Sequence, residues 1–155
     1  MYFFSEKLRQ ELIQNLIDGN QKQYPRQKKV QLQIASSETM GRRQEMEDVQ
    51  CVIPDFLTFR LRKGGLERND SQVRETLLCL FDGHGGRDCS EKLSRVFPNC
   101  LADVVNEIMT VTEFQSTLQI PLKAWETIFT SCFLLIDREM RKMKIEAGST
   151  AAIVY

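Results

Sequence analysis

One stretch of this chain places side chains that can bind metal and move protons directly after an apolar run. Residues 81–86 hold an aspartate, the single histidine of the chain and three glycines, and they follow the apolar residues 77–80. The carboxylate of Asp82 suits a hard cation such as Mg²⁺ or Mn²⁺. The imidazole of His84 can move a proton near neutral pH. Because glycine lets the backbone approach a ligand closely, the stretch predicts a chemical site rather than a packing pattern.

A second segment, residues 41–48, combines arginine with carboxylates. Glu47 and Asp48 stand at the start of an expected strand. Because adjacent strand residues point to opposite faces, we expect one of them near a metal and the other in a supporting position behind it. Arg43 lies four to five residues earlier, and its planar guanidinium can bind phosphate oxygens.

Together the two segments favour metal-assisted hydrolysis of a phosphate ester. Two metal ions about 3.5–4 Å apart, bridged by one carboxylate, would activate water for in-line attack. The arginine would bind the non-bridging oxygens, and the histidine would protonate the leaving alkoxide. Taken singly, Asp82 is also typical of a turn, Arg43 of a solvated charge, and Glu47 with Asp48 of charges at a strand entry. The combination favours the site.

Hydrophobic periodicity predicts the elements of the first half. A helix is expected over residues 5–18, and a half-buried strand follows at Val30, Leu32 and Ile34. A second strand is expected over residues 49–56, with a continuation to residue 59. Eight of the 16 residues from 60 to 75 are charged, which indicates a solvated connection. The strand at 76–81 is then expected to end in a sharp turn.

The second half predicts helices followed by a strand. One helix is expected over residues 88–97, where Pro98 breaks or restarts it. An apolar stripe with helical spacing covers residues 122–140, and Gly148 is expected to end that segment. Residues 150–155 are apolar and β-branched, as is typical of a strand. Neighbouring strands with short links favour antiparallel pairing in an α+β fold.

Composition narrows the class of protein. Lys plus Arg is 21 and Asp plus Glu is 21, so the net charge is zero, which gives no support for nucleic-acid binding or a polybasic membrane surface. No stretch approaches the roughly 20 apolar residues that span a bilayer. Five cysteines without a C-x-x-C pair indicate buried, reduced thiols. We therefore expect a monomer of the cytoplasm or nucleus, with no nucleic-acid or membrane partner.

The segments occur in the order and approximate spacing of one protein family. Arg43-x-x-x-Glu47-Asp48 comes first, then Phe-Asp-Gly-His-Gly-Gly at residues 81–86, then Gly-Ser-Thr-Ala at residues 148–151. From about residue 30 to residue 155, the chain resembles the N-terminal part of the PPM-type (type 2C) metal-dependent protein serine/threonine phosphatases.

This resemblance implies a fold and a domain organisation. The family is α+β, a four-layer α/β/β/α sandwich of antiparallel sheets flanked by helices, and the chain would hold only its N-terminal part. Residues 1–25 would form an N-terminal helix and connector. Residues 26–155 would form a partial PPM-type phosphatase domain.

The resemblance also implies a metal site that holds two Mg²⁺ or Mn²⁺ ions in the complete domain. Asp82 resembles the carboxylate that bridges the two ions. Gly83 resembles the residue whose backbone carbonyl binds one of them. Glu47 and Asp48 resemble the acidic pair that supports the metal and its waters.

The remaining positions imply protein dephosphorylation. Arg43 resembles the arginine that binds the phosphate, and His84 resembles the general acid for the leaving serine or threonine oxygen. Thr150 resembles a position that lines the site. The substrate would be a phosphoprotein, hydrolysed at phosphoserine or phosphothreonine by metal-activated water.

Two other functions stay open. The family uses further aspartates from its C-terminal half, whereas this sequence stops at residues 153–155 within an apolar strand pattern. We therefore expect the front part of a longer domain, or a truncated form or pseudophosphatase that acts as a non-catalytic interaction protein. A different metal-dependent phosphoesterase, acting on nucleotides or small phosphates, is the third candidate. The lack of a Walker-type loop and of a His-rich cluster counts against it.

Overall fold

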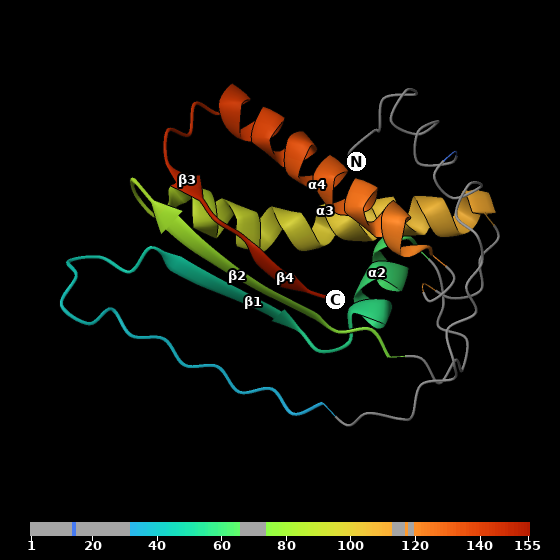
Figure 1. The fold of residues 1–155 in the computed structure, drawn as a ribbon, viewed down its shortest axis with the longest axis horizontal. Helices are drawn as coiled ribbons and strands as arrows, with labels where there is room; N and C mark the ends of the chain where they lie inside the picture. Colours follow the sequence, from blue (N-terminus) through green and yellow to red (C-terminus); the bar gives the residue numbers. More distant parts are fainter. Residues whose placement is uncertain (1–13, 15–31, 66–73, 113–116, 118–119) are drawn as a thin grey trace.

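The fold is α+β, with an antiparallel sheet packed against helices (Figure 1). The computed structural model describes residues 14, 32–65, 74–112, 117 and 120–155. In chain order its elements are β1 (Asp48–Ile53), α2 (Phe56–Lys63), β2 (Leu77–His84), α3 (Asp88–Thr112), α4 (Leu122–Lys142), β3 (Gly148–Ser149) and β4 (Ala152–Val154). Of the helix expected over residues 5–18, only residue 14 lies within these ranges. Val30, the first residue of the first expected strand, lies outside them.

The strand β2 lies at the centre of the sheet, with a neighbour on each edge. β1 pairs with it antiparallel, which sets Asp48 opposite Asp82. On the other edge, β3 and β4 both pair antiparallel with β2. The pairs Gly83–Ser149 and Leu80–Ala152 are three residues apart on each strand, so β3 and β4 share one register. They therefore act as one strand interrupted at residues 150–151.

The two faces of the sheet differ in burial. Leu77, Cys79 and Phe81 point toward the helices and are buried. The alternate side chains of β2 point the other way, and Leu80 is 44% exposed. We call this second side the open face. Its side chains in the sheet include Val52, Leu78, Leu80, Ala152 and Val154.

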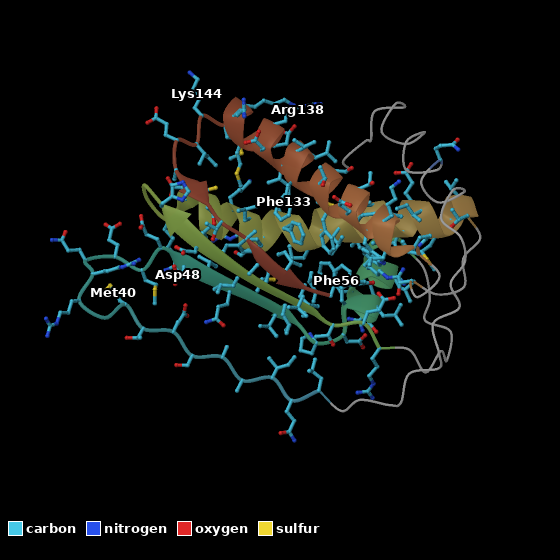
Figure 2. The ribbon with its side chains drawn as sticks, viewed as in Figure 1. Met40, Asp48, Phe56, Phe133, Arg138 and Lys144 are labelled. Carbon is cyan, nitrogen blue, oxygen red and sulfur yellow. The ribbon has the colours of Figure 1, made fainter. Side chains whose placement is uncertain are left out.

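The core lies between the sheet and the helices. α3 packs along β1 and β2, and α4 packs on α3 (Figure 1). The ring of Phe81 meets Phe97 edge-on at 6.1 Å, and Phe97 stacks on Phe133 at 5.1 Å. Phe133 lies between α4 and α3 (Figure 2). Each such side chain contributes about 1.5–3 kcal/mol when fully buried.

The helix α3 runs unbroken through Pro98, so the break predicted there is wrong. A proline inside a helix costs about 3 kcal/mol, because it removes a hydrogen bond and crowds the preceding turn. Phe97 and Leu101 beside it are fully buried. Their burial, at about 1.5–3 kcal/mol each, outweighs the local cost.

The chain after β1 turns into a helix, contrary to the predicted strand continuation to residue 59. Asp55 caps α2, because its carboxylate accepts hydrogen bonds from the Thr58 backbone N–H at 3.1 Å and the Thr58 hydroxyl at 2.8 Å. Such caps stabilise a helix by about 1 kcal/mol. Phe56, expected at a strand end, is instead fully buried at the first turn of α2.

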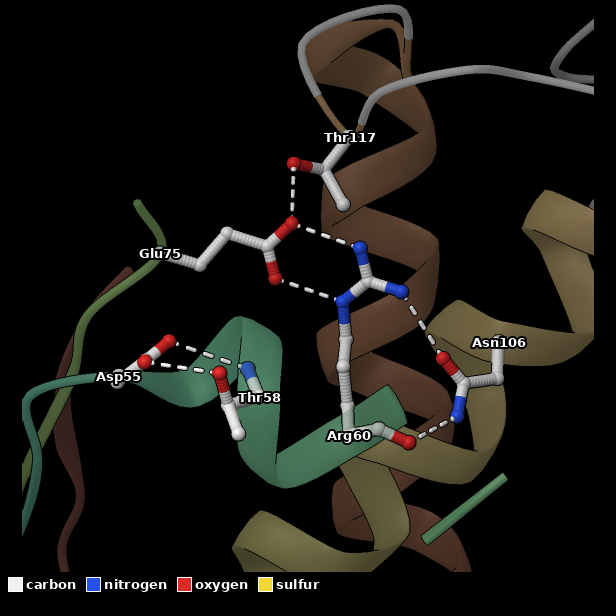
Figure 3. A network of polar contacts seen from close by, with 6 residues as sticks. All are labelled: Asp55, Thr58, Arg60, Glu75, Asn106 and Thr117. Carbon is white, nitrogen blue, oxygen red and sulfur yellow. Dashed lines mark hydrogen bonds and ion pairs between the residues drawn. The ribbon is translucent and has the colours of Figure 1, made fainter. Parts of the chain in front are cut away.

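A buried polar network joins α2 to the start of β2 and to α3 (Figure 3). The Arg60 guanidinium donates hydrogen bonds to both carboxylate oxygens of Glu75, at 2.6 and 2.7 Å, and both side chains are 5% exposed. It also donates to the Asn106 amide oxygen at 2.9 Å, and the Thr117 hydroxyl donates to Glu75 at 3.0 Å. Burial by itself lowers the pKa of Arg60, but the Glu75 carboxylate more than offsets this and raises it. The solvated connection predicted for residues 60–75 is therefore wrong for Arg60 and Glu75, whereas Arg62, Lys63 and Arg74 are exposed as expected.

Three further expectations are corrected. Leu32 and Ile34 have no regular structure and are 55% and 37% exposed, so the described part of the first predicted strand is not a strand. The turn predicted at residues 81–86 begins only after His84, because β2 continues to that residue. α4 ends at Lys142, before Gly148. The described ranges hold one sheet with its helices, and the second sheet of the expected four-layer sandwich is not among them.

The expectations about the cysteines and about membrane-spanning helices can be compared with the structure. All five cysteines are free thiols, and four of them are buried. Among the helices that the structure describes, none combines the length and the apolar character needed to cross a bilayer.

Candidate functional site

The central position of the candidate site belongs to Asp82, near the end of β2. Its neighbour on β1 is Asp48. On the other edge its carbonyl accepts a hydrogen bond from the Thr150 backbone N–H at 2.8 Å, as the shared register of β3 and β4 requires. Residues directly opposite one another in antiparallel strands project to the same face. Asp48, Asp82 and Thr150 therefore form a row across the open face, which we call the acidic row.

Two like charges stand directly opposite each other in the acidic row. Cβ atoms of opposite residues lie about 4.5–5.5 Å apart, and like charges at this spacing destabilise the pair. Neither Asp48 nor Asp82 takes part in an ion pair within the part of the chain that the structure describes. A divalent cation between the two carboxylates would remove this repulsion, and carboxylate oxygens are its preferred ligands. The residues present therefore fit Mg²⁺ or Mn²⁺.

The two carboxylates do not make a complete metal site. No group of three or more His, Cys, Asp or Glu side chains within the described ranges could hold a metal ion. A cation at the acidic row would take its remaining ligands from water, backbone oxygens or groups outside these ranges.

The side chain of Glu47 bonds to the glycine turn and does not lie in the acidic row with Asp48. Its carboxylate accepts a hydrogen bond from the Gly86 backbone N–H at 2.6 Å. Its carbonyl accepts from the Gly83 N–H at 3.3 Å and from the Ser90 hydroxyl at 2.5 Å. The structure thus separates the expected acidic pair, with Asp48 in the acidic row and Glu47 holding the turn after β2 and the first turn of α3.

Gly83 is required by the closeness of its neighbours. A Cβ atom at this position would lie 2.7 Å from the Glu47 carbonyl oxygen and 2.9 Å from the Ser90 hydroxyl. Any side chain here would push β1 and α3 away from β2. Gly83 therefore lets the strand that bears Asp82 lie close against both.

His84 follows Asp82 by two residues and points to the same face. Its ring lies directly against Gly148, where a Cβ atom would collide with the imidazole. The next two residues, Gly85 and Gly86, have φ of 74° and 117°, which other residues rarely adopt. The expected turn of glycines is present, but the strand before it ends three residues later than predicted, at His84, which leaves His84 on the strand beside the acidic row.

Arg43 is not brought to the acidic row. It lies exposed in the loop before β1, where its backbone N–H donates to the Met40 carbonyl at 3.3 Å. Figure 2 shows Met40 on this loop and Asp48 at the start of β1. The guanidinium of Arg43 makes no hydrogen bond or ion pair with any described residue.

Two residues that support the site were not expected from the sequence. Ser90 is fully buried and bonds the Glu47 carbonyl. Arg87 donates from its guanidinium to the Met46 carbonyl at 3.2 Å, which ties the end of the glycine turn to the start of β1. A serine early in a helix and an arginine after two glycines have no distinctive pattern, so only the three-dimensional pairing reveals these two.

Comparison with known proteins finds similar proteins that share one family name. No family model matches it. Protein phosphatase 2C 16 of Arabidopsis thaliana is 28% identical to it over 105 residues, covering 64% of this chain and 20% of that protein. Protein phosphatase 2C 50 of Oryza sativa subsp. japonica is 27% identical over 115 residues, covering 66% of this chain and 28% of that protein. Protein phosphatase 2C 7 of Arabidopsis thaliana is 24% identical over 106 residues, covering 65% and 21%.

These similarities support a type 2C protein phosphatase-like family for the chain. The resemblance inferred from residues 43–48, 81–86 and 148–151 is thereby confirmed. The chain spans between a fifth and just over a quarter of the length of these curated relatives.

Proposed function

We propose that the chain supplies the front part of the catalytic domain of a metal-dependent protein serine/threonine phosphatase. The names of its relatives support a protein phosphatase. The observation that carries the proposal is the acidic row, in which Asp82 on the central strand lies opposite Asp48 with no cationic side chain paired to either in the described ranges.

In this proposal the acidic row holds the cation. Asp82 and Asp48 are the direct ligands, with Mg²⁺ or Mn²⁺ as the ion and a second ion in the complete domain. The Gly83 carbonyl is the backbone ligand. Glu47 supports the site indirectly, by fixing the Gly86 N–H and the start of β1. The bound ion would supply Lewis acidity and an ionised water.

Other residues near the acidic row would bind the phosphate and donate a proton. His84 lies about 7 Å along the strand from Asp82, on the same face, which suits a general acid for the leaving serine or threonine oxygen. Arg43 binds phosphate oxygens if the loop before β1 moves toward the row, and Thr150 lines the row's other edge. The substrate is a phosphoprotein.

The open face also fits the expected sandwich. Along β2 it changes from apolar at Leu78 and Leu80 to polar at Asp82 and His84. Val52 and Val154 on the neighbouring strands extend the apolar part and are 39% and 63% exposed. We propose that a second sheet covers this apolar part in the complete domain, which leaves the acidic row at the rim between the sheets.

Calorimetric titration of Mn²⁺ tests the cation site. The 155-residue chain should bind Mn²⁺ with micromolar affinity, and Asp82→Asn should lose this binding. Asp137→Asn is the matched control, because Asp137 is an exposed carboxylate on α4 that pairs with Arg141 at 2.9 Å. Equal heats in Asp82→Asn and the unsubstituted chain, or no heat from a folded chain, would contradict the assignment.

Unfolding with and without a chelator gives a second, independent test of the cation site. Without metal, Asp82→Asn removes a cross-strand repulsion and should raise the free energy of unfolding by about 0.2–1 kcal/mol. With saturating Mn²⁺ the order should reverse, because only the unsubstituted chain gains binding energy. Urea unfolding in EDTA and in Mn²⁺ measures both values.

Hydrolysis is tested separately. A phosphothreonine peptide should release phosphate in the presence of Mn²⁺ when the rest of the catalytic domain is present, and Asp82→Asn should abolish the release. Retained hydrolysis in Asp82→Asn would overturn the proposed chemistry.

A further inference from the structure

Two cysteines face each other across the strands that carry the acidic row. Cys51 on β1 lies directly opposite Cys79 on β2, and both are free thiols. Cα atoms of opposite residues in an antiparallel pair are about 4.5–5.5 Å apart. Disulfides join Cα atoms about 4.4–6.8 Å apart, so the Cα spacing of this register lies within the range of a disulfide.

The two thiols differ in their access to solvent. Cys79 is buried at 5% exposure on the central strand. Cys51 is partly exposed, and it lies on β1, an edge strand among the described residues. A hydrogen bond from the Cys79 thiol lowers the pKa of Cys51 to about 7, although burial opposes this. Thiolate character and access together define a reactive cysteine.

A second pair of thiols offers an internal comparison. Cys100 on α3 and Cys132 on α4 are also hydrogen-bonded to each other, but both are fully buried. An oxidant in solution cannot reach them without unfolding. Two pairs of neighbouring thiols are therefore present, and only the pair of Cys51 and Cys79 has a member that is partly exposed to solvent.

We infer that Cys51 and Cys79 are a peroxide-sensitive dithiol that closes into a cross-strand disulfide. The Cys51 thiolate attacks a hydroperoxide, so an S–O bond forms, the O–O bond breaks, and water or an alcohol leaves after protonation. The Cys79 thiol then attacks the Cys51 sulfur. The S–S bond forms as the S–O bond breaks, and the Cys79 proton leaves with the departing hydroxide as water. The dithiol loses two electrons and the peroxide gains them.

The bond would act on the neighbouring site. Asp48 and Asp82 lie three residues along each strand from the two cysteines, about 10 Å away. A disulfide at this point fixes β1 to β2 in the register that sets the two carboxylates opposite each other. The inference concerns thiol chemistry alone, so it stands whether or not the chain belongs to an active phosphatase.

Peptide mapping after peroxide treatment tests the inference. Trypsin cuts after Arg43, Arg60, Arg74 and Arg87, so Cys51 lies in peptide 44–60 and Cys79 in peptide 75–87. The folded chain treated with hydrogen peroxide should lose two hydrogens in mass and yield these peptides joined, in a form that dithiothreitol separates. Cys51→Ala should abolish the joined pair, and Cys100→Ala should leave it unchanged.

Alkylation keeps the test valid if a cysteine variant folds poorly. In the unsubstituted chain at neutral pH, iodoacetamide should label Cys51 first among the five cysteines. Prior peroxide treatment should prevent this labelling, and dithiothreitol should restore it. A folded chain that forms the 100–132 bond first, forms only disulfides between molecules, or leaves Cys51 unlabelled would overturn the inference.

Discussion

The imidazole of His84 occupies the space that a side chain at residue 148 would need. Because a Cβ atom there would collide with the ring, Gly148→Ala should displace His84 from its place beside the acidic row. Because His84 is exposed and its ring is the far end of a flexible side chain, the ring can turn into solvent, and we expect a destabilisation of about 0.5 kcal/mol. Urea unfolding measures it, and the resonances of the single histidine report the ring displacement by NMR.

A double-mutant cycle separates this collision from other effects of alanine. In the His84→Ala background the ring is gone, so Gly148→Ala should cost much less than it does alone. Equal costs in the two backgrounds would mean that the ring does not set the requirement for glycine at residue 148.

Single residues show how far the sequence predicted the site. Asp82, His84 and Asp48 were expected from residue types and spacing, and the structure places them on one face of the sheet. That Asp48 and not Glu47 lies opposite Asp82 depends on the register of two strands far apart in the chain. Ser90 acts through a contact with Glu47, 43 residues away. Local patterns contain no information on either pairing.

At the scale of elements, the helix α2 depends on a buried ion pair. The Arg60 and Glu75 side chains are both 5% exposed, so removing one leaves the other charge buried and unpaired. Glu75→Ala should lower the free energy of unfolding by about 3–5 kcal/mol, as measured by urea denaturation.

An exposed ion pair provides the matched comparison. Arg141 and Asp137 on α4 form a pair whose side chains are 80% and 55% exposed. Asp137→Ala should change the free energy of unfolding by no more than about 0.5 kcal/mol. Similar losses for Glu75→Ala and Asp137→Ala would show that the network in Figure 3 contributes little to stability.

The same element explains an error of prediction. The residues from 60 to 75 are half charged, so composition predicted a solvated segment. In the structure two of those charges neutralise each other inside the protein, and Asn106 and Thr117 bond them from other parts of the chain. Composition cannot distinguish a solvated charge from one whose partner lies 15 residues away. By contrast α4, predicted from a long apolar stripe, is present within a few residues of its expected bounds.

At the scale of the whole molecule, the open face is the main exposed apolar surface of the sheet. Leu80 and Val154 are 44% and 63% exposed there, and contiguous apolar surface of this kind marks an interaction site. A dye that binds apolar surface, such as ANS, should therefore bind the chain. The double substitution Leu80→Lys with Val154→Lys should reduce its fluorescence and leave the far-ultraviolet circular dichroism unchanged.

An isolated exposed leucine is the control for the open face. Leu134 on α4 is 57% exposed, so Leu134→Lys removes a comparable amount of apolar surface elsewhere. We expect this substitution to change ANS fluorescence little. An equal decrease from Leu134→Lys would show that the dye does not distinguish the sheet face from the rest of the surface.

The position of β2 between two neighbours has a consequence for the speed of cation capture. Its backbone is hydrogen-bonded to β1 on one edge and to the β3–β4 segment on the other, so Asp82 starts from a backbone that is already ordered. An arriving ion then has little chain entropy to remove. The rate at which the ion binds should then be set by the exchange of its own hydration water. Mn²⁺ should therefore bind faster than Mg²⁺, which dehydrates slowly.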